Sequence, residues 1–233
     1  MEIKTYSELL AAIGTEYPNS GLYYRGLSDS TNKLIPSLYF KQLKSTPKET
    51  EIKFLIDFIN ESDIKSINNV HHSVWIKAFL GRHNGLRLRI MDWTTNISVA
   101  LNFMINESKD KAALYVMANY EDLIVDDSVY NESYFDCLQT AMLNPAFYSE
   151  YSQLRAYKNR FIQNGKFLIQ NYEDARNCYY ERNKRDINKI EISQKYFTEI
   201  YGECCKSFDY ESKLPIYFKD SKLTPLCEKI NKG

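Results

Sequence analysis

The sequence lacks long apolar runs and an excess of charge of either sign. No stretch approaches the roughly 20 apolar residues that a membrane-spanning helix needs, and the start, MEIKTY, lacks the apolar centre of a signal peptide. Thirty basic and thirty acidic side chains cancel, so no overall field draws the chain to nucleic acid or to an anionic membrane. These absences predict a cytoplasmic protein that does not associate with membranes.

Cysteine and histidine are also sparse. The five cysteines are odd in number and include no CxxC pair, and the three histidines fall far from them in the sequence. Disulfide frameworks and zinc sites both need more regular spacing. The chain has no HExxH motif, and it has neither the GxxxxGKS/T nor the GxGxxG phosphate loop. We therefore expect reduced cysteines and no bound metal.

Patterns of helix and strand alternate along the chain, without a repeat, a low-complexity stretch or a linker. Hydrophobic residues make up 44% and charged residues 26%, which is the balance of an ordinary globular protein. Residues 119–145 are poorly patterned and are expected to be loop with one short helix. The sequence thus predicts one α+β domain over residues 1–233, with a mixed central β-sheet flanked by helices. Helices are expected near 6–13, 47–59, 73–83, 97–104, 194–204 and 221–230, and strands near 22–26, 86–91, 112–118, 160–169 and 187–192.

The first candidate site is the end of the first predicted strand, Tyr24-Arg25-Gly26. A guanidinium can offer two parallel N–H donors to a phosphate, and a neighbouring glycine lets the backbone approach a ligand closely. The alternative is structural, with Arg25 paired to a nearby carboxylate such as Asp92. The spacing alone leaves both interpretations open.

The second candidate site is residues 92–95, a predicted polar turn between a strand and a helix. Such a turn is a general anion site, because free backbone N–H groups and the helix dipole face outward there. Thr94 and Thr95 add hydroxyl donors, and Arg89 adds positive charge. The alternative is that Asp92 and Thr94 only cap the following helix.

The third candidate is Gln163, which lies on a predicted strand close to Gly165. Its amide can hydrogen-bond a ribose hydroxyl or an amide of a ligand. The alternative is a cross-strand polar contact within the protein.

Together these segments resemble the FRG-domain family, named for a Phe-Arg-Gly motif that follows an N-terminal helix. Here Tyr24-Arg25-Gly26 takes that place, and a Leu-Ile-Pro-Ser stretch follows at 34–37. The family's central motif, roughly Gln-His-Tyr-Gly-Leu-Pro-Thr-Arg-Leu-Leu-Asp-Trp-Thr, is similar to residues 82–94. Segments at 160–167, 189–192 and 216–220 extend the resemblance over essentially the full chain. Within the central motif the matching residues are His83, Gly85, Arg89, Asp92, Trp93 and Thr94.

The chain departs from the central motif at four positions. Arg82, Asn84, Arg87 and Leu88 stand where the family has Gln, Tyr, Pro and Thr. If these positions contact the substrate, this member has changed its ligand or lost its activity.

The order of the motifs is in turn similar to that of ADP-ribosyltransferases, which implies a related fold and NAD as the cofactor. By this resemblance Arg25 holds the pyrophosphate, Thr94 holds the nicotinamide ribose, and Gln163 orients that ribose. An oxocarbenium-like state needs a negative group nearby, and Asp92 or Glu150 would supply it.

The resemblance implies two overlapping sets of site residues, with a Tyr or Trp ring stacked on the nicotinamide. The catalytic set is Arg25, Asp92, Thr94 and Gln163. The cofactor-binding set is Tyr24, Arg25, Gly26, His83, Arg89, Trp93, Thr94 and Thr95.

Three functions remain open at this level. The resemblance implies an NAD-using transferase or an NAD-cleaving enzyme, as in toxins and phage-defence effectors, with a protein or a nucleic acid as acceptor. The second function is a module that senses a nucleotide without turnover. The third is nucleic-acid binding through a local strip formed by Arg82, Arg87 and Arg89.

Overall fold

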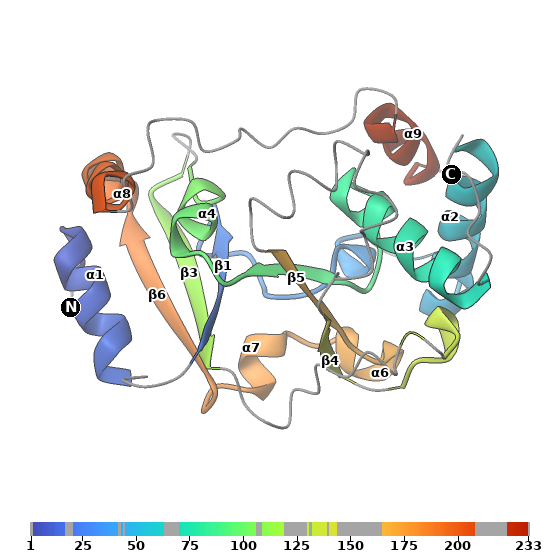
Figure 1. Ribbon diagram of the computed structural model, residues 1–233, viewed down its shortest axis with the longest axis horizontal. Helices are drawn as coiled ribbons and strands as arrows, with labels where there is room; N and C mark the ends of the chain where they lie inside the picture. Colours follow the sequence, from blue (N-terminus) through green and yellow to red (C-terminus); the bar gives the residue numbers. More distant parts are fainter. Residues whose placement is uncertain are drawn as a thin grey trace.

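In the computed structural model the chain is built around one six-stranded β-sheet (Figure 1). The structure describes residues 2–16, 21–41, 43, 45–62, 70–105, 109–118, 130, 132–138, 140–143, 165–207 and 223–232. The strands are β1 (Leu22–Leu27), β2 (Met91–Thr94), β3 (Lys111–Ala118), β4 (Ala141–Leu143), β5 (Gly165–Ile169) and β6 (Ile187–Ser193). The helices are α1 (Tyr6–Glu16), α2 (Pro47–Glu61), α3 (Val70–His83), α4 (Ile97–Asn102), α6 (Tyr172–Ala175), α7 (Tyr179–Arg182), α8 (Gln194–Ser207) and α9 (Leu223–Ile230), with 3₁₀ turns η1 (Ser37–Tyr39) and η3 (Tyr134–Asp136).

The strands follow the order β4-β5-β2-β1-β3-β6, and every described pair of neighbours is antiparallel. The predicted α+β class is confirmed, but the sheet is antiparallel where a mixed sheet was expected. The pairing of β1 with β3 gives the reason. Leu27 pairs with Ala113 and Leu22 with Ala118, so β3 starts beside the end of β1. A parallel pair would need a connection that carries the chain back to the opposite end of the sheet.

Both faces of the sheet are covered, as the central strand β3 shows. Leu114 and Val116 pack into a core with α1, α4 and α8, while Tyr115 and Met117 pack on the other face beside α7. In Figure 1, α1 and α8 lie at one end of the molecule and α2, α3 and α9 gather at the other end. A third core fills the space among α2, α3 and α9. The sheet is therefore buried between layers, and ligands can reach it only where the helical cover is open.

Two of the predicted helices begin with a reciprocal cap. The Glu8 backbone N–H donates to Thr5 Oγ1 at 3.2 Å, and the Thr5 N–H donates to the Glu8 carboxylate at 3.2 Å. The same reciprocal pair joins Thr46 and Glu49 at α2, where Pro47 is the first helical residue. Each cap contributes about 1 kcal/mol. These local signals fix the starts of α1 and α2 correctly.

Gly26 allows β1 to lie directly against α4. A β-carbon at this position would lie 2.0 Å from the Ala100 carbonyl oxygen and 2.7 Å from Met104 Cγ. Both distances are far shorter than a van der Waals contact, and the nearer atom belongs to the backbone of α4, which cannot move aside. The glycine of the Tyr-Arg-Gly motif is therefore required for strand–helix packing.

The structure corrects the prediction for residues 86–94. The strand β2 begins only at Met91, so residues 86–90 are irregular and the predicted turn at 92–94 is strand. The backbone N–H groups of residues 87–89 donate to side-chain oxygens. These hydrogen bonds take the place of those that a neighbouring strand would provide. The N–H groups of Arg87, Leu88 and Arg89 donate to Asn231 Oδ1, Ser37 Oγ and Glu51 Oε1 at 3.0, 3.3 and 2.6 Å.

The weakly patterned regions account for the other differences. The three-residue strand β4 was not predicted. The 3₁₀ turn η3 lies within 119–145, where one short helix was expected, but residues 119–129 lie outside the described residues. Of the strand expected at 160–169, residues 165–169 form β5, and the residues before 165 lie outside the described residues. Within the described part of the chain, no helix has the combination of length and apolar character that would let it cross a membrane.

Candidate functional site

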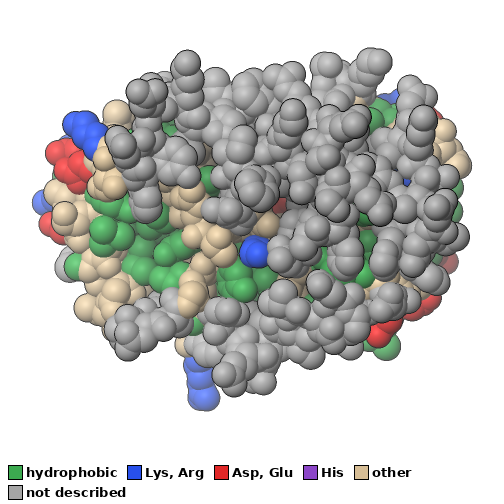
Figure 2. All heavy atoms as spheres, viewed as in Figure 1, with side chains coloured by type: hydrophobic (Ala, Val, Ile, Leu, Met, Phe, Trp, Pro, Cys, Tyr) green, Lys and Arg blue, Asp and Glu red, His purple; other side chains and the backbone are tan. Residues whose placement is uncertain are grey.

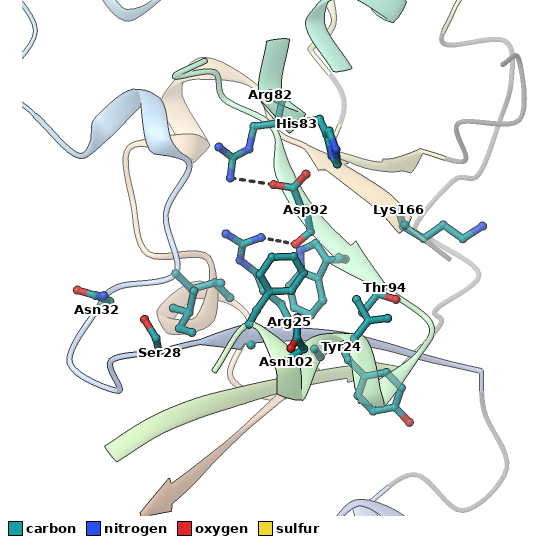
Figure 3. A pocket seen from close by; sticks show the side chains of 18 of the residues that line it. Tyr24, Arg25, Ser28, Asn32, Arg82, His83, Asp92, Thr94, Asn102 and Lys166 are labelled. Carbon is teal, nitrogen blue, oxygen red and sulfur yellow. Dashed lines mark hydrogen bonds and ion pairs between the residues drawn. The ribbon is translucent and has the colours of Figure 1, made fainter. Parts of the chain in front are cut away.

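A cavity of about 760 Å³ lies beside β1 and β2 (Figure 3). Its wall is formed by β1, the loop that follows it, the last turn of α3, β2, α4 and the start of β5. The first two candidate segments of the sequence therefore lie together at one cavity. From the third segment, Gly165 lines the same wall, while Gln163 lies outside the described residues.

Arg25 and Arg82 converge on Asp92. Arg25 Nη1 donates to the backbone carbonyl oxygen of Asp92, and Arg82 Nη2 lies 2.8 Å from the Asp92 carboxylate. Figure 3 shows both guanidinium groups pointing toward Asp92. The side chains of Arg82 and Asp92 are 15% and 39% exposed. Arg25 is thus held at the wall by a carbonyl, and the carboxylate pairs with Arg82, the residue that replaces the family's Gln.

The other predicted residues divide between the cavity wall and elsewhere. Thr95 is exposed and does not belong to the wall. Thr94 Oγ1 accepts the Asn96 N–H at 3.0 Å, and Asn96 Oδ1 in turn accepts the Ser98 N–H at 3.0 Å. Asn96 is therefore the cap of α4, which leaves Thr94 on the strand at the cavity. The remaining wall residues of the predicted set are Tyr24, Gly26, His83, Trp93 and Thr94.

Arg89 does not contribute to the cavity, which corrects its predicted role in cofactor binding. Its side chain is 0% exposed and lies 3.2 Å from the carboxylate of Glu51, which is also 0% exposed. The guanidinium donates to the carbonyl oxygens of Cys137 and Gln170 at 2.9 and 3.0 Å, and to that of Tyr134. Arg89 is a structural residue of the core.

The pKa of Arg89 reflects this environment. Burial is the largest influence and acts to lower the pKa, but the Glu51 carboxylate together with Tyr134, Tyr172 and Cys137 outweighs it, so the net shift of the pKa is upward. The phenol of Tyr134 donates to Glu51 at 2.8 Å, and burial together with that carboxylate raises the pKa of Tyr134 well above its ordinary value. The buried Arg89 guanidinium is thus held in its charged form.

The predicted strip of arginines for nucleic-acid binding does not exist as a surface. Arg89 is buried, and Arg87 donates to the carbonyl oxygens of Ser37 and Leu38 at 3.1 and 2.9 Å. Arg82 faces Asp92 in the cavity. The alternation of charged and apolar residues suggested this strip, but residues 86–90 form an irregular segment in which Arg87 and Arg89 contact the protein itself.

Two tightly packed side chains of the cavity wall each have an N–H group without a hydrogen-bond acceptor among the described residues. These groups are Arg82 Nε and Trp93 Nε1, and both atoms are buried. The Trp93 side chain is only 2% exposed and packs in the core between β2 and β3, so its ring is not available for stacking on a ligand. Its polar edge is the part that lacks a partner.

Sequence reasoning missed several wall residues. Lys166 lines the cavity from β5, and burial lowers the pKa of its ammonium group. Phe40, Phe103 and Ile105 add an apolar, exposed part of the wall. Lys166 lies within the segment 160–167 that resembles the family, whereas nothing in the sequence around Phe40 indicates a site.

Metal ligands were expected to be absent. In the ranges that the structure describes, no three His, Cys, Asp or Glu side chains gather closely enough to hold a metal ion.

Comparison with known proteins places part of the chain in a family. No curated protein and no solved structure matches the chain. The family model of the FRG domain matches residues 20–113, which run from β1 into β3. The match includes Arg25, Arg82 and Asp92, whereas the resemblance noted at 160–167, 189–192 and 216–220 falls outside it. Over residues 20–113 the resemblance to the FRG-domain family is confirmed.

Proposed function

We propose that the cavity binds NAD and that the domain cleaves it or transfers its ADP-ribose, in the manner of an ADP-ribosyltransferase. The observation that carries the proposal is the convergence of Arg25 and Arg82 on one wall of a 760 Å³ cavity that also contains Lys166. Ligand sites typically have volumes of about 300–1,000 Å³, so a dinucleotide fits. An enzyme that depletes NAD would act as a toxin or as a phage-defence effector.

The balance of donors and acceptors in the wall favours an oxyanion as ligand. Asp92 is the only carboxylate among the described wall residues, whereas the wall has four basic side chains, Arg25, Lys33, Arg82 and Lys166. The unpartnered N–H groups of Arg82 and Trp93 add to this surplus of donors. Buried donors are rarely left without an acceptor, and a diphosphate brings several oxygen acceptors that suit arginine.

The proposed reaction breaks the bond between ribose C1′ and the nicotinamide nitrogen, and the electron pair leaves with nicotinamide. Water, or a nucleophile of a protein or nucleic-acid acceptor, then forms a bond to C1′ and releases a proton. The intervening oxocarbenium-like state is positively charged, and the Asp92 carboxylate would stabilise it. Thr94 would hold a ribose hydroxyl, and Gln163 would orient the ribose.

The test is release of nicotinamide from NAD by the purified protein. We expect Arg25→Ala to abolish release, because the pyrophosphate loses its anchor. Arg176→Ala is the matched control, since this arginine is 51% exposed and is not part of the cavity wall. Absence of release from the unmodified protein, or full activity of Arg25→Ala, would contradict the enzymatic proposal.

A second candidate is a sensor that binds NAD without turnover. It is favoured by the ion pair between Arg82 and Asp92, because this pair occupies the one described carboxylate of the wall. A sensor would gain thermal stability from NAD by mass action without releasing nicotinamide. Arg25→Ala would remove that stabilisation, and Arg176→Ala would not.

A further inference from the structure

Three of the six large hydrophobic side chains exposed on the described surface lie together at the cavity. Phe40, Phe103 and Ile105 are 62%, 39% and 49% exposed, and all three line its wall. Exposed apolar clusters that adjoin a cavity mark a binding surface more often than isolated apolar residues do. The other exposed large hydrophobic residues, Leu10, Ile56 and Leu138, lie outside the wall.

The apolar part of the wall adjoins the basic part. On the face in Figure 2, hydrophobic side chains gather over α4 and the neighbouring strands, and a basic side chain stands beside them near the centre. Phe103 and Ile105 follow α4, whereas Arg25 lies on β1, which packs directly against α4 at Gly26. One ligand can therefore contact an apolar surface and a cationic surface at the same time.

Resting on the proposed function, we propose that Phe40 and Phe103 form the subsite for the nucleotide base, while Arg25 and Arg82 bind the diphosphate. A nucleotide has this division, because its base is planar and apolar on both faces and its diphosphate is anionic. Every base can stack on an aromatic ring. The ring of Trp93 is buried and Tyr24 is half-buried, so Phe40 and Phe103 are the more exposed aromatic rings of the described wall.

Two probes separate the two parts of the site. Inorganic pyrophosphate contacts only the cationic part, and ADP-ribose contacts both parts. Calorimetric titration would compare the unmodified protein with Phe40→Ala, Phe103→Ala and the control Leu138→Ala, whose side chain is 76% exposed away from the wall. Phe40→Tyr keeps the ring and should bind as the unmodified protein does.

We expect each alanine variant to weaken ADP-ribose binding by about fivefold or more, the lower end of what one stacked ring contributes. Pyrophosphate binding should stay within about twofold of its original value, which also shows that the variants are folded. Unchanged ADP-ribose binding in both variants, or an equal loss for both probes, would overturn the base subsite. Unchanged binding would instead point to an apolar segment of an acceptor protein at this surface.

The outcome also distinguishes the subsite from the reaction. If nicotinamide is never released but the two probes behave as expected, the base subsite stands and only the enzymatic proposal fails. If NAD is cleaved and the phenylalanine variants bind ADP-ribose normally, the enzyme stands and the subsite fails. If neither probe binds the unmodified protein, both are wrong.

Discussion

Two arginine–carboxylate pairs in this molecule have opposite surroundings. The pair of Arg89 and Glu51 is 0% exposed on both sides, whereas Arg82 and Asp92 are 15% and 39% exposed at a cavity. The buried guanidinium donates to three backbone carbonyls, and the buried carboxylate accepts two tyrosine hydroxyls. Within the described part of the chain, neither Arg82 Nε nor Arg89 Nε has a hydrogen-bond partner, so the two pairs differ in burial and in their other contacts. Complete burial and the bonds to carbonyls and tyrosines make the first pair part of the core, whereas partial exposure leaves the second pair able to exchange partners with a ligand.

The largest effect should come from breaking the buried pair. Glu51→Ala leaves the Arg89 guanidinium uncompensated in the core and removes the acceptor of Tyr134 and Tyr172. We expect a loss of about 3–5 kcal/mol in the free energy of unfolding, measured by urea denaturation. Glu61→Ala is the control, because its pair with Lys229 is largely exposed and should contribute less than about 1 kcal/mol. Equal losses in the two variants would remove the distinction between a core pair and a surface pair.

An intermediate effect is expected at Gly26, which lies between the cavity and the core. In Gly26→Ala the new methyl group would meet the Ala100 carbonyl oxygen at 2.0 Å, so β1 and α4 must separate. Overpacking of this kind costs about 1–3 kcal/mol, and thermal denaturation would show it as a lower Tm.

Gly14→Ala is a control for Gly26→Ala with the opposite sign. Gly14 lies within α1, and nothing stands within 4 Å of a β-carbon there. Replacing a helix glycine by alanine should stabilise the protein by up to about 1 kcal/mol. If Gly26→Ala proved as well tolerated as Gly14→Ala, the close packing of β1 on α4 would be wrong.

The comparison also shows which parts of the structure were predictable. The starts of α1 and α2, which are capped by Thr5 and Thr46, and the buried strand at 112–118 depend on neighbours in sequence, and their positions were predicted correctly. The position of Arg89 depends on Glu51, which precedes it by 38 residues, and on the carbonyl of Gln170, which follows it by 81. Local alternation cannot report such contacts, so Arg89 was assigned to the ligand.

The candidate site was predictable to a similar degree. Arg25 and residues 92–94 were found because a motif marks each of them, and the fold brings them together. Lys166 and Phe40 carry no motif of their own, and they join the wall only because β5 pairs with β2 and because η1 follows the loop after β1. The residues that sequence reasoning missed are thus those placed by long-range pairing.

The smallest effect on stability is expected from the cavity pair. In Asp92→Asn the side chain keeps its shape but loses the charge that faces Arg82 at 2.8 Å. Because the pair is partly exposed, the free energy of unfolding should change by less than about 1 kcal/mol.

The same variant should bind pyrophosphate more tightly, because the ligand no longer competes with the Asp92 carboxylate for Arg82. One charge contact in a hydrated site is worth about 1 kcal/mol, so the affinity for pyrophosphate should rise about fivefold. Nicotinamide release should fall, because the oxocarbenium-like state loses its negative neighbour. Tighter pyrophosphate binding with slower release would identify Asp92 as a catalytic residue that competes with the substrate's own phosphates, whereas weaker binding would show that Asp92 holds Arg82 in its binding position.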